Sequence, residues 1–182
     1  DGDAVPLANP LSAELAVMRT ALLPGLVAAL ARNVARQQTR VRLFELGNVF
    51  ARAAEDGASP RETLRVAAIA CGTAAPEQWD ERARQVDFHD LKGDLESLAG
   101  LSGAQMEFRR SQAPWGHSGR SADVYRDGVR LGWIGQLHPR LQQALGLDVD
   151  VVAFELDLEP LLVRPVPKAE PLSRYPSVRR DL

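Results

Sequence analysis

The 182-residue sequence has one cysteine, few aromatic residues and no long apolar run. The single cysteine, Cys71, cannot form an internal disulfide, which is typical of proteins in a reducing compartment. No apolar run approaches the roughly 20 residues of a membrane-spanning helix, and no signal peptide opens the sequence. We therefore expect a cytoplasmic protein with no membrane contact. Both ends of the sequence look cut, which predicts a piece of a larger polypeptide.

Sequence patterns for phosphate and metal binding are also missing. Neither GxGxxG nor GxxxxGK[ST] occurs, so no glycine-rich loop is expected to hold a phosphate. One cysteine and three scattered histidines lack the spacing of a zinc site. A net charge of −2 excludes a uniformly basic nucleic-acid-binding protein, although it allows a local basic patch.

Apolar periodicity is present throughout and predicts an α+β domain with a mainly antiparallel sheet flanked by helices. Asp87 is expected to cap a helix, Asp127-Gly128 to form a type I′ hairpin turn, and Gly146 to stop a helix. Thr20 is a candidate N-cap, and Gly47 predicts a bulge or a close approach within a strand. The expected helices span 21–38, 88–98, 139–145 and 158–162, and the expected strands span 41–50, 64–71, 104–109, 121–125, 129–137 and 151–156. Residues 53–62 are read as a loop, 114–119 as a turn-rich link, and 163–182 as a proline-rich linker.

Three groups of polar residues are candidate sites. His89 with Asp90, Lys92 and Asp94 could perform acid–base chemistry, but a polar helix start explains them better. His117 and Ser118 near Asp123 could suggest a hydrolase, but the serine lacks a nucleophile elbow. Glu45 could be a buried functional carboxylate, but a pair with an arginine such as Arg19 or Arg42, or an outward-facing position, explains it better.

Aromatic and basic residues are candidates for an RNA-binding surface. Trp115, Tyr125 and Trp133 could stack on bases, although Trp133 is expected in the core. The arginines that could contact phosphate are Arg32, Arg36, Arg40 and Arg42, and a solvated helix face is favoured for them.

Taken together, the sequence blocks resemble the bacterial phenylalanyl-tRNA synthetase β subunit. The resemblance covers Ala8 to Leu182 and is carried by ANPLSAELAVMRTALLPGLVAALARNVARQ, VRLFELGNVF, DFHDLKGDLESLAG, HSGRSADVY, GWIGQLHPRL, VVAFELDLEPLL and RYPSVRRDL. Each block is weak alone, but their order and spacing are specific in combination.

This resemblance implies a catalytic-like module with the core fold of a class II aminoacyl-tRNA synthetase at residues 1–162. Residues 163–182 would lead towards a ferredoxin-like anticodon-binding domain that lies outside the sequence. The implied partners are the α subunit, in an α2β2 heterotetramer, and tRNA(Phe) through the whole complex. ATP and Mg²⁺ are implied for the whole enzyme.

Compared with the catalytic α subunit of that family, three segments lack the nucleotide-contacting residues. An Arg-Thr-His-Thr-Ser-Pro stretch in the α subunit becomes Arg19-Thr-Ala-Leu-Leu-Pro24, and Gly-Arg-Val-Tyr-Arg becomes Gly47-Asn-Val-Phe-Ala51, with Arg52 one position off. A Gly-x-Gly-x-Glu-Arg motif becomes Glu155-Leu-Asp157-Leu-Glu-Pro160, whose extra carboxylates would repel a triphosphate.

The resemblance therefore implies no catalytic, cofactor-binding or metal-binding residues in this chain, and a structural role beside the α subunit. Two alternatives stay open. One is an independent RNA-binding module that uses Arg32, Arg36 and Arg40. The other is a residually active class II core that uses Arg42 or Arg52 on phosphate.

Overall fold

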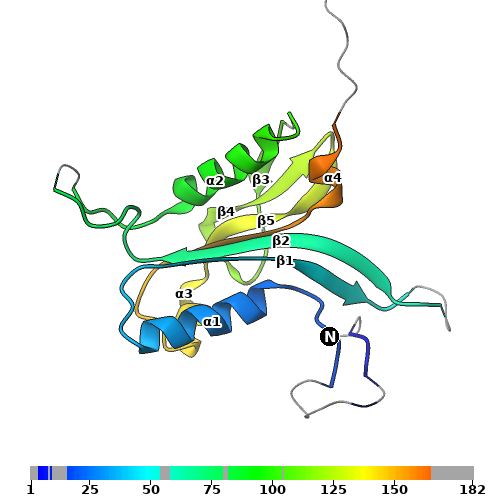
Figure 1. The fold of residues 1–182 in the computed structure, drawn as a ribbon, viewed down its shortest axis with the longest axis horizontal. Helices are drawn as coiled ribbons and strands as arrows, with labels where there is room; N and C mark the ends of the chain where they lie inside the picture. The colour runs from blue at the N-terminus through cyan, green and yellow to red at the C-terminus, as the bar shows by residue number, and fades with distance from the viewer. Residues whose placement is uncertain are drawn as a thin grey trace, which may run out of the picture.

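The computed structural model describes residues 4–7, 9, 16–53, 58–79, 82–103 and 105–164. Within them, an antiparallel sheet of six strands runs in the order β1-β2-β6-β5-β4-β3, with helices on both faces (Figure 1). The predicted α+β class, with an antiparallel sheet flanked by helices, is confirmed. The strands are β1 Val41–Ala51, β2 Arg61–Cys71, β3 Glu107–Arg110, β4 Gly116–Arg126, β5 Val129–Leu137 and β6 Val151–Asp157, and the helices are α1 Leu23–Ala35, α2 Phe88–Gly100, α3 Pro139–Ala144 and α4 Glu159–Leu162.

The last strand in sequence, β6, lies in the middle of the sheet between β2 and β5. Its residues from Val151 to Leu156 are all buried, because helices cover both faces at this point. On one face α1 packs over β1, β2 and β6, and on the other α2 packs over β5 and β6. Two separate apolar cores result, one on each side of the sheet.

Local sequence signals set several element ends as predicted. Asp87 caps α2 through its side chain, which accepts the backbone N–H groups of His89 and Asp90 in a capping box. Asp127 and Gly128 have φ angles of 50° and 79°, as a type I′ turn between β4 and β5 requires.

Three local predictions need correction. Helix α1 begins at Leu23, after Leu22 as N-cap, and no side chain of its own first turn caps it, so Thr20 is not the cap. The segment read as a turn-rich link belongs partly to β4, which starts at Gly116 and pairs with β5 through an irregular register. Gly47 marks no bulge, because β1 and β2 pair in continuous register from Val41 to Ala51.

Beyond α4, Val163 and Arg164 stay in contact with the domain: the Val163 carbonyl oxygen accepts from Arg126 at 2.6 Å, and Arg164 donates to the carbonyl oxygen of Leu101 at 2.8 Å. Residues 165–182 lie outside the described part of the chain. The proline-rich linker therefore stays a prediction. No described helix is long and apolar enough to cross a membrane.

Candidate functional site

The segments expected to have lost nucleotide contacts meet at the start of α1. The Glu155 carboxylate on β6 is 8% exposed, and its Oε2 accepts the backbone N–H groups of Leu22 at 3.1 Å and Leu23 at 2.9 Å. The first N–H groups of a helix have no partner within the helix and carry its positive end. Glu155 therefore caps α1 from a strand more than 130 residues further along the chain.

An arginine on the neighbouring strand completes this cluster. Arg65 of β2 donates from Nη1 to Glu155 Oε1 at 3.0 Å and from Nε to Asp157 Oδ1 at 2.7 Å. Burial works against the charge of Arg65, but the hydrogen bonds to Asp157 and Glu155 outweigh it and raise its pKa. Arg65 therefore stays charged, with both carboxylates as partners. We call Arg65, Glu155 and Asp157 the β6 acid cluster.

The sequence comparison interpreted Glu155 and Asp157 as extra carboxylates that would repel a triphosphate. The structure adds that both acids are paired with Arg65 and that Glu155 also caps α1. A helix start and an arginine are the two groups that most often bind phosphate oxygens. Here both are occupied by carboxylates of the chain itself. An incoming anion would have to displace Glu155 from the two N–H groups of α1 and from Arg65.

The remaining segment of the three, at Gly47, is held by Arg19. Arg19 donates from Nε to the carbonyl oxygen of Asn48 at 2.7 Å and pairs with the Glu45 carboxylate. A Cβ on Gly47 would lie 2.3 Å from the Arg19 guanidinium, so the predicted close approach is confirmed. Glu45 pairs with Arg19 rather than Arg42, and Arg52 lies exposed beyond the end of β1.

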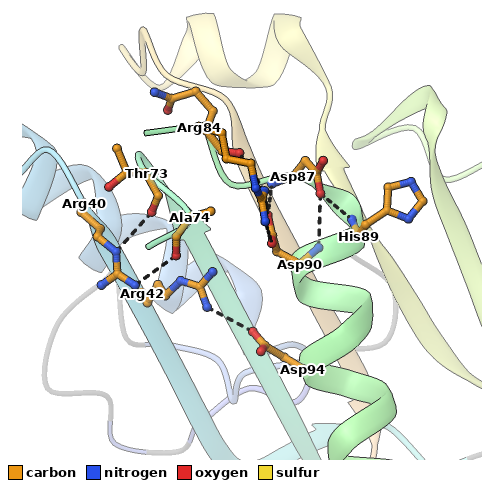
Figure 2. Close-up of polar contacts among 10 residues, drawn as sticks. Arg40, Arg42, Thr73, Ala74, Arg84, Asp87, His89, Asp90 and Asp94 are labelled. Atoms are coloured by element: carbon orange, nitrogen blue, oxygen red, sulfur yellow. Dashed lines mark hydrogen bonds and ion pairs between the residues drawn. The ribbon is translucent and has the colours of Figure 1, made fainter. Parts of the chain in front are cut away.

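The polar residues at the start of α2 form a second cluster, drawn in Figure 2. The Asp90 carboxylate accepts from Arg84 at 2.6 and 2.7 Å and from the backbone N–H of Asp87 at 2.9 Å. The Arg84 hydrogen bonds lower the pKa of Asp90 to about 2, against the effect of its burial. The His89 ring points away from this pair, so the contacts favour a polar helix start over acid–base machinery.

The residues of the candidate hydrolase are not brought together. Asp123 accepts from Arg130 at 2.8 Å and from Ser111 at 3.2 Å. The Nδ1 atom of His117 accepts the backbone N–H of Gly119, two residues away.

The candidate RNA-binding residues are dispersed. Trp133 is buried in the core on the α1 face, and Tyr125 lies against Arg109. Arg40 donates to the carbonyl oxygens of Thr73 and Ala74, and Arg42 reaches Asp94 on α2 at 3.3 Å (Figure 2). Of the four candidate arginines, Arg32 in the last turn of α1 and its C-cap Arg36 are exposed, and neither side chain has a hydrogen-bond partner among the described residues. Trp115 is 45% exposed.

Sequence reasoning missed Arg65, the residue that links the two acids. The sequence shows only that Arg65 is a charged residue within the strand β2. It lies opposite Asp157 because of the β2–β6 register, which the sequence does not reveal. Among the described residues, no group of three or more histidine, cysteine or acidic side chains is placed to hold a metal ion.

The sequence of the chain is similar to a family of known proteins. Residues 1–158 match the sequence model described as "Phenylalanyl tRNA synthetase beta chain CLM domain". The phenylalanine–tRNA ligase beta subunit of Xanthomonas oryzae pv. oryzae (strain MAFF 311018) is 68% identical over 178 residues, which are 98% of this chain and 22% of that protein. The corresponding subunit of Xylella fastidiosa (strain Temecula1 / ATCC 700964) is 66% identical with the same coverage. The chain therefore spans about a fifth of these relatives, and it belongs to the family of phenylalanyl-tRNA synthetase beta chain CLM domains.

Proposed function

We propose that this chain is a non-catalytic module that packs on the catalytic α subunit of phenylalanine–tRNA ligase and supports aminoacylation of tRNA(Phe). In this proposal the module comprises residues 1–162, and 163–182 form a linker towards an anticodon-binding domain. The whole enzyme would be a cytoplasmic α2β2 heterotetramer that uses ATP and Mg²⁺.

A class II synthetase core is the fold that we propose for the module. The antiparallel sheet with helices on both faces supports this assignment. So does the position of the three altered segments, which come together at the start of α1 although they are far apart in sequence.

The single observation that carries the non-catalytic role is the β6 acid cluster. Glu155 takes both the N-terminal N–H groups of α1 and an oxygen-binding position of Arg65. A phosphate bound at this helix start would need the same donors, so the residues present here do not fit a nucleotide phosphate. We therefore assign no catalytic, cofactor-binding or metal-binding residue in this chain.

Calorimetry tests this proposal. The purified chain is titrated with ATP plus Mg²⁺, with phenylalanine, and with both together, and the assembled α2β2 enzyme serves as the positive control. We expect heat of binding from the assembled enzyme only. Micromolar ATP affinity in the isolated chain, or amino-acid-dependent pyrophosphate exchange, would support a residually active core instead.

RNA binding is the second candidate, because two exposed arginines, Arg32 in the last turn of α1 and Arg36 at its C-cap, lie one turn apart. We expect Arg40 to contribute less to RNA binding, because its guanidinium already donates to the carbonyl oxygens of Thr73 and Ala74, just after β2. A gel-shift titration with tRNA at two salt concentrations tests it. Phosphate contacts predict a steep loss of affinity at the higher salt, and Arg32→Ala with Arg36→Ala should abolish that loss.

A further inference from the structure

A cavity of about 650 Å³ opens beside the β6 acid cluster. It lies between α1 and the region of α3, on the face of the sheet that α1 covers. Figure 1 shows these two helices on the same side of the sheet. Most of the wall is apolar and includes Val27 and Ala28 from α1, Leu141 and Leu145 from α3 and its C-cap, and Trp115 and Trp133. We call this cavity the α1–α3 groove.

The rim of the groove is unusually apolar for a solvent-facing surface. Trp115 is 45% exposed and Leu145 is 41% exposed, and they are joined by the exposed Pro24 and Ala28. The Trp115 ring stands edge-on to the buried Trp133, with ring centroids 6.5 Å apart, so one side of it packs against the core. A half-exposed tryptophan beside small apolar residues is typical of the anchors that carry protein–protein affinity.

The floor of the groove holds the two carboxylates of the β6 acid cluster. Glu155 uses both carboxylate oxygens on α1 and Arg65, while Asp157 gives only Oδ1 to Arg65 and is 29% exposed. Its Oδ2 atom has no hydrogen-bond partner among the described residues. The two carboxylates share a single arginine, because Arg130, the other cation in the wall, is paired with Asp123. The groove therefore offers an apolar wall and one acceptor for a cation.

We propose that the α1–α3 groove docks a segment of the α subunit that inserts a lysine or arginine side chain towards Asp157 and lays apolar side chains on Trp115. This inference rests on the proposed function, since it names the surface through which the module would bind its partner. A basic side chain with an apolar stem matches the groove, because the stem packs on the apolar wall while the charge reaches the carboxylate. The exposed apolar rim runs from Pro24 and Ala28 to Trp115 and Leu145. A polypeptide segment with several apolar side chains can cover all of these residues at once, so it is the favoured occupant.

The test uses the full β subunit and the α subunit and measures their dissociation constant by biolayer interferometry. Trp115→Ala removes the apolar anchor, and Asp157→Asn removes the charge while keeping the shape. We expect each to weaken α binding by about tenfold or more, the size of a single interface anchor. Asp157→Asn should also flatten the salt dependence of affinity between about 50 and 500 mM, because it removes the charge pair.

Phe44→Ser is the matched control. Phe44 is 80% exposed on the opposite face of the sheet, two residues from Arg42, which reaches Asp94 of α2 on that face. It should change the affinity by less than about threefold, as residues away from an interface do. Thermal unfolding of every variant checks the fold, and Leu145→Ser on the same rim replaces Trp115→Ala if that variant melts early.

The outcomes separate the two proposals. If the unaltered β subunit does not bind the α subunit, the proposed function fails. If it binds and the groove variants keep its affinity, or if Phe44→Ser weakens binding as much as they do, the docking inference is overturned while the proposed function stands.

Discussion

Glu155→Ala should destabilise the domain more than any other single carboxylate removal in the described part of the chain. The substitution leaves the N–H groups of Leu22 and Leu23 without their acceptor and leaves Arg65 with Asp157 alone. Leu22 is 1% exposed, so water cannot readily replace the lost oxygen there.

The expected cost follows from these contacts. Removing one partner of a buried ion pair costs about 3–5 kcal/mol, mainly because the other charge is left buried. Arg65 is only partly buried and keeps Asp157, which places the loss near the lower end. Each buried donor without a partner adds about 1–3 kcal/mol, but the N–H of Leu23 is only partly buried. The lower end of the ion-pair cost and about 1 kcal/mol for the buried N–H of Leu22 together predict that Glu155→Ala lowers the free energy of unfolding by about 4 kcal/mol.

Glu155→Gln separates the cap from the charge. The glutamine carbonyl oxygen can still accept from the start of α1, but it offers no charge to Arg65. We expect Glu155→Gln to lower the free energy of unfolding by about 1–2 kcal/mol, because the hydrogen bond to the charged Arg65 becomes weaker.

Urea unfolding followed by circular dichroism measures these differences, with an unchanged m-value as the sign that two-state unfolding is kept. Glu45→Ala is the control, because it removes an ion pair whose side chains are 45% and 33% exposed. Exposed pairs contribute under about 1 kcal/mol. The reasoning is refuted if Glu155→Ala costs no more than Glu45→Ala.

The remaining predictions concern the helix start, a glycine and two titrating groups. Asp87→Ala should lower the unfolding free energy by about 1 kcal/mol in the same urea assay, because the α2 cap is lost. Gly132→Ala should cost about 3 kcal/mol by thermal melting, since a Cβ there would lie 2.0 Å from a backbone carbonyl of β6 and the strand would have to move. The pKa of Asp90 is lowered to about 2, so its contribution to stability is complete above its unfolded-state pKa near 4 and is lost as the pH falls towards 2; an NMR titration should find this pKa, and Arg84→Ala should raise it. Burial raises the pKa of the Cys71 thiol, so a thiol reagent should react with it slowly at pH 8 in the folded protein and quickly after unfolding in urea.

Much of the fold could be predicted because its signals are local. Asp87 caps the helix that begins at the next residue, and the turn at Asp127-Gly128 joins two adjacent strands. Both features depend on a few consecutive residues, whose backbone preferences act before any tertiary contact forms. The near-continuous apolar runs along β2 and β6 likewise predicted strands, because a strand that is covered on both faces carries apolar side chains in both directions.

The features that sequence reasoning missed depend on long-range contacts. Thr20 looked like the cap of α1 because a threonine suits that position, but the cap comes from Glu155 on another strand. The role of Glu155 depends on the position of β6 beside β2, which sets Arg65 opposite Asp157. Strand order is a property of the whole sheet, so no local pattern around these residues could reveal it. The three altered segments were identified by comparison with a family, but their contact with one another appears only in the folded chain.

The contacts of Glu155 tie the proposed loss of nucleotide binding to the stability of the fold. The oxygens that occupy the α1 start and Arg65 also fasten α1 to the central strand. A substitution that freed these donors for a phosphate would therefore loosen the helix that presents them. A working phosphate site needs donors that are held in place before the ligand arrives. Removing the Glu155 carboxylate alone therefore cannot restore a phosphate site. Glu155 is better explained as a residue that holds the fold together than as the remnant of a nucleotide site.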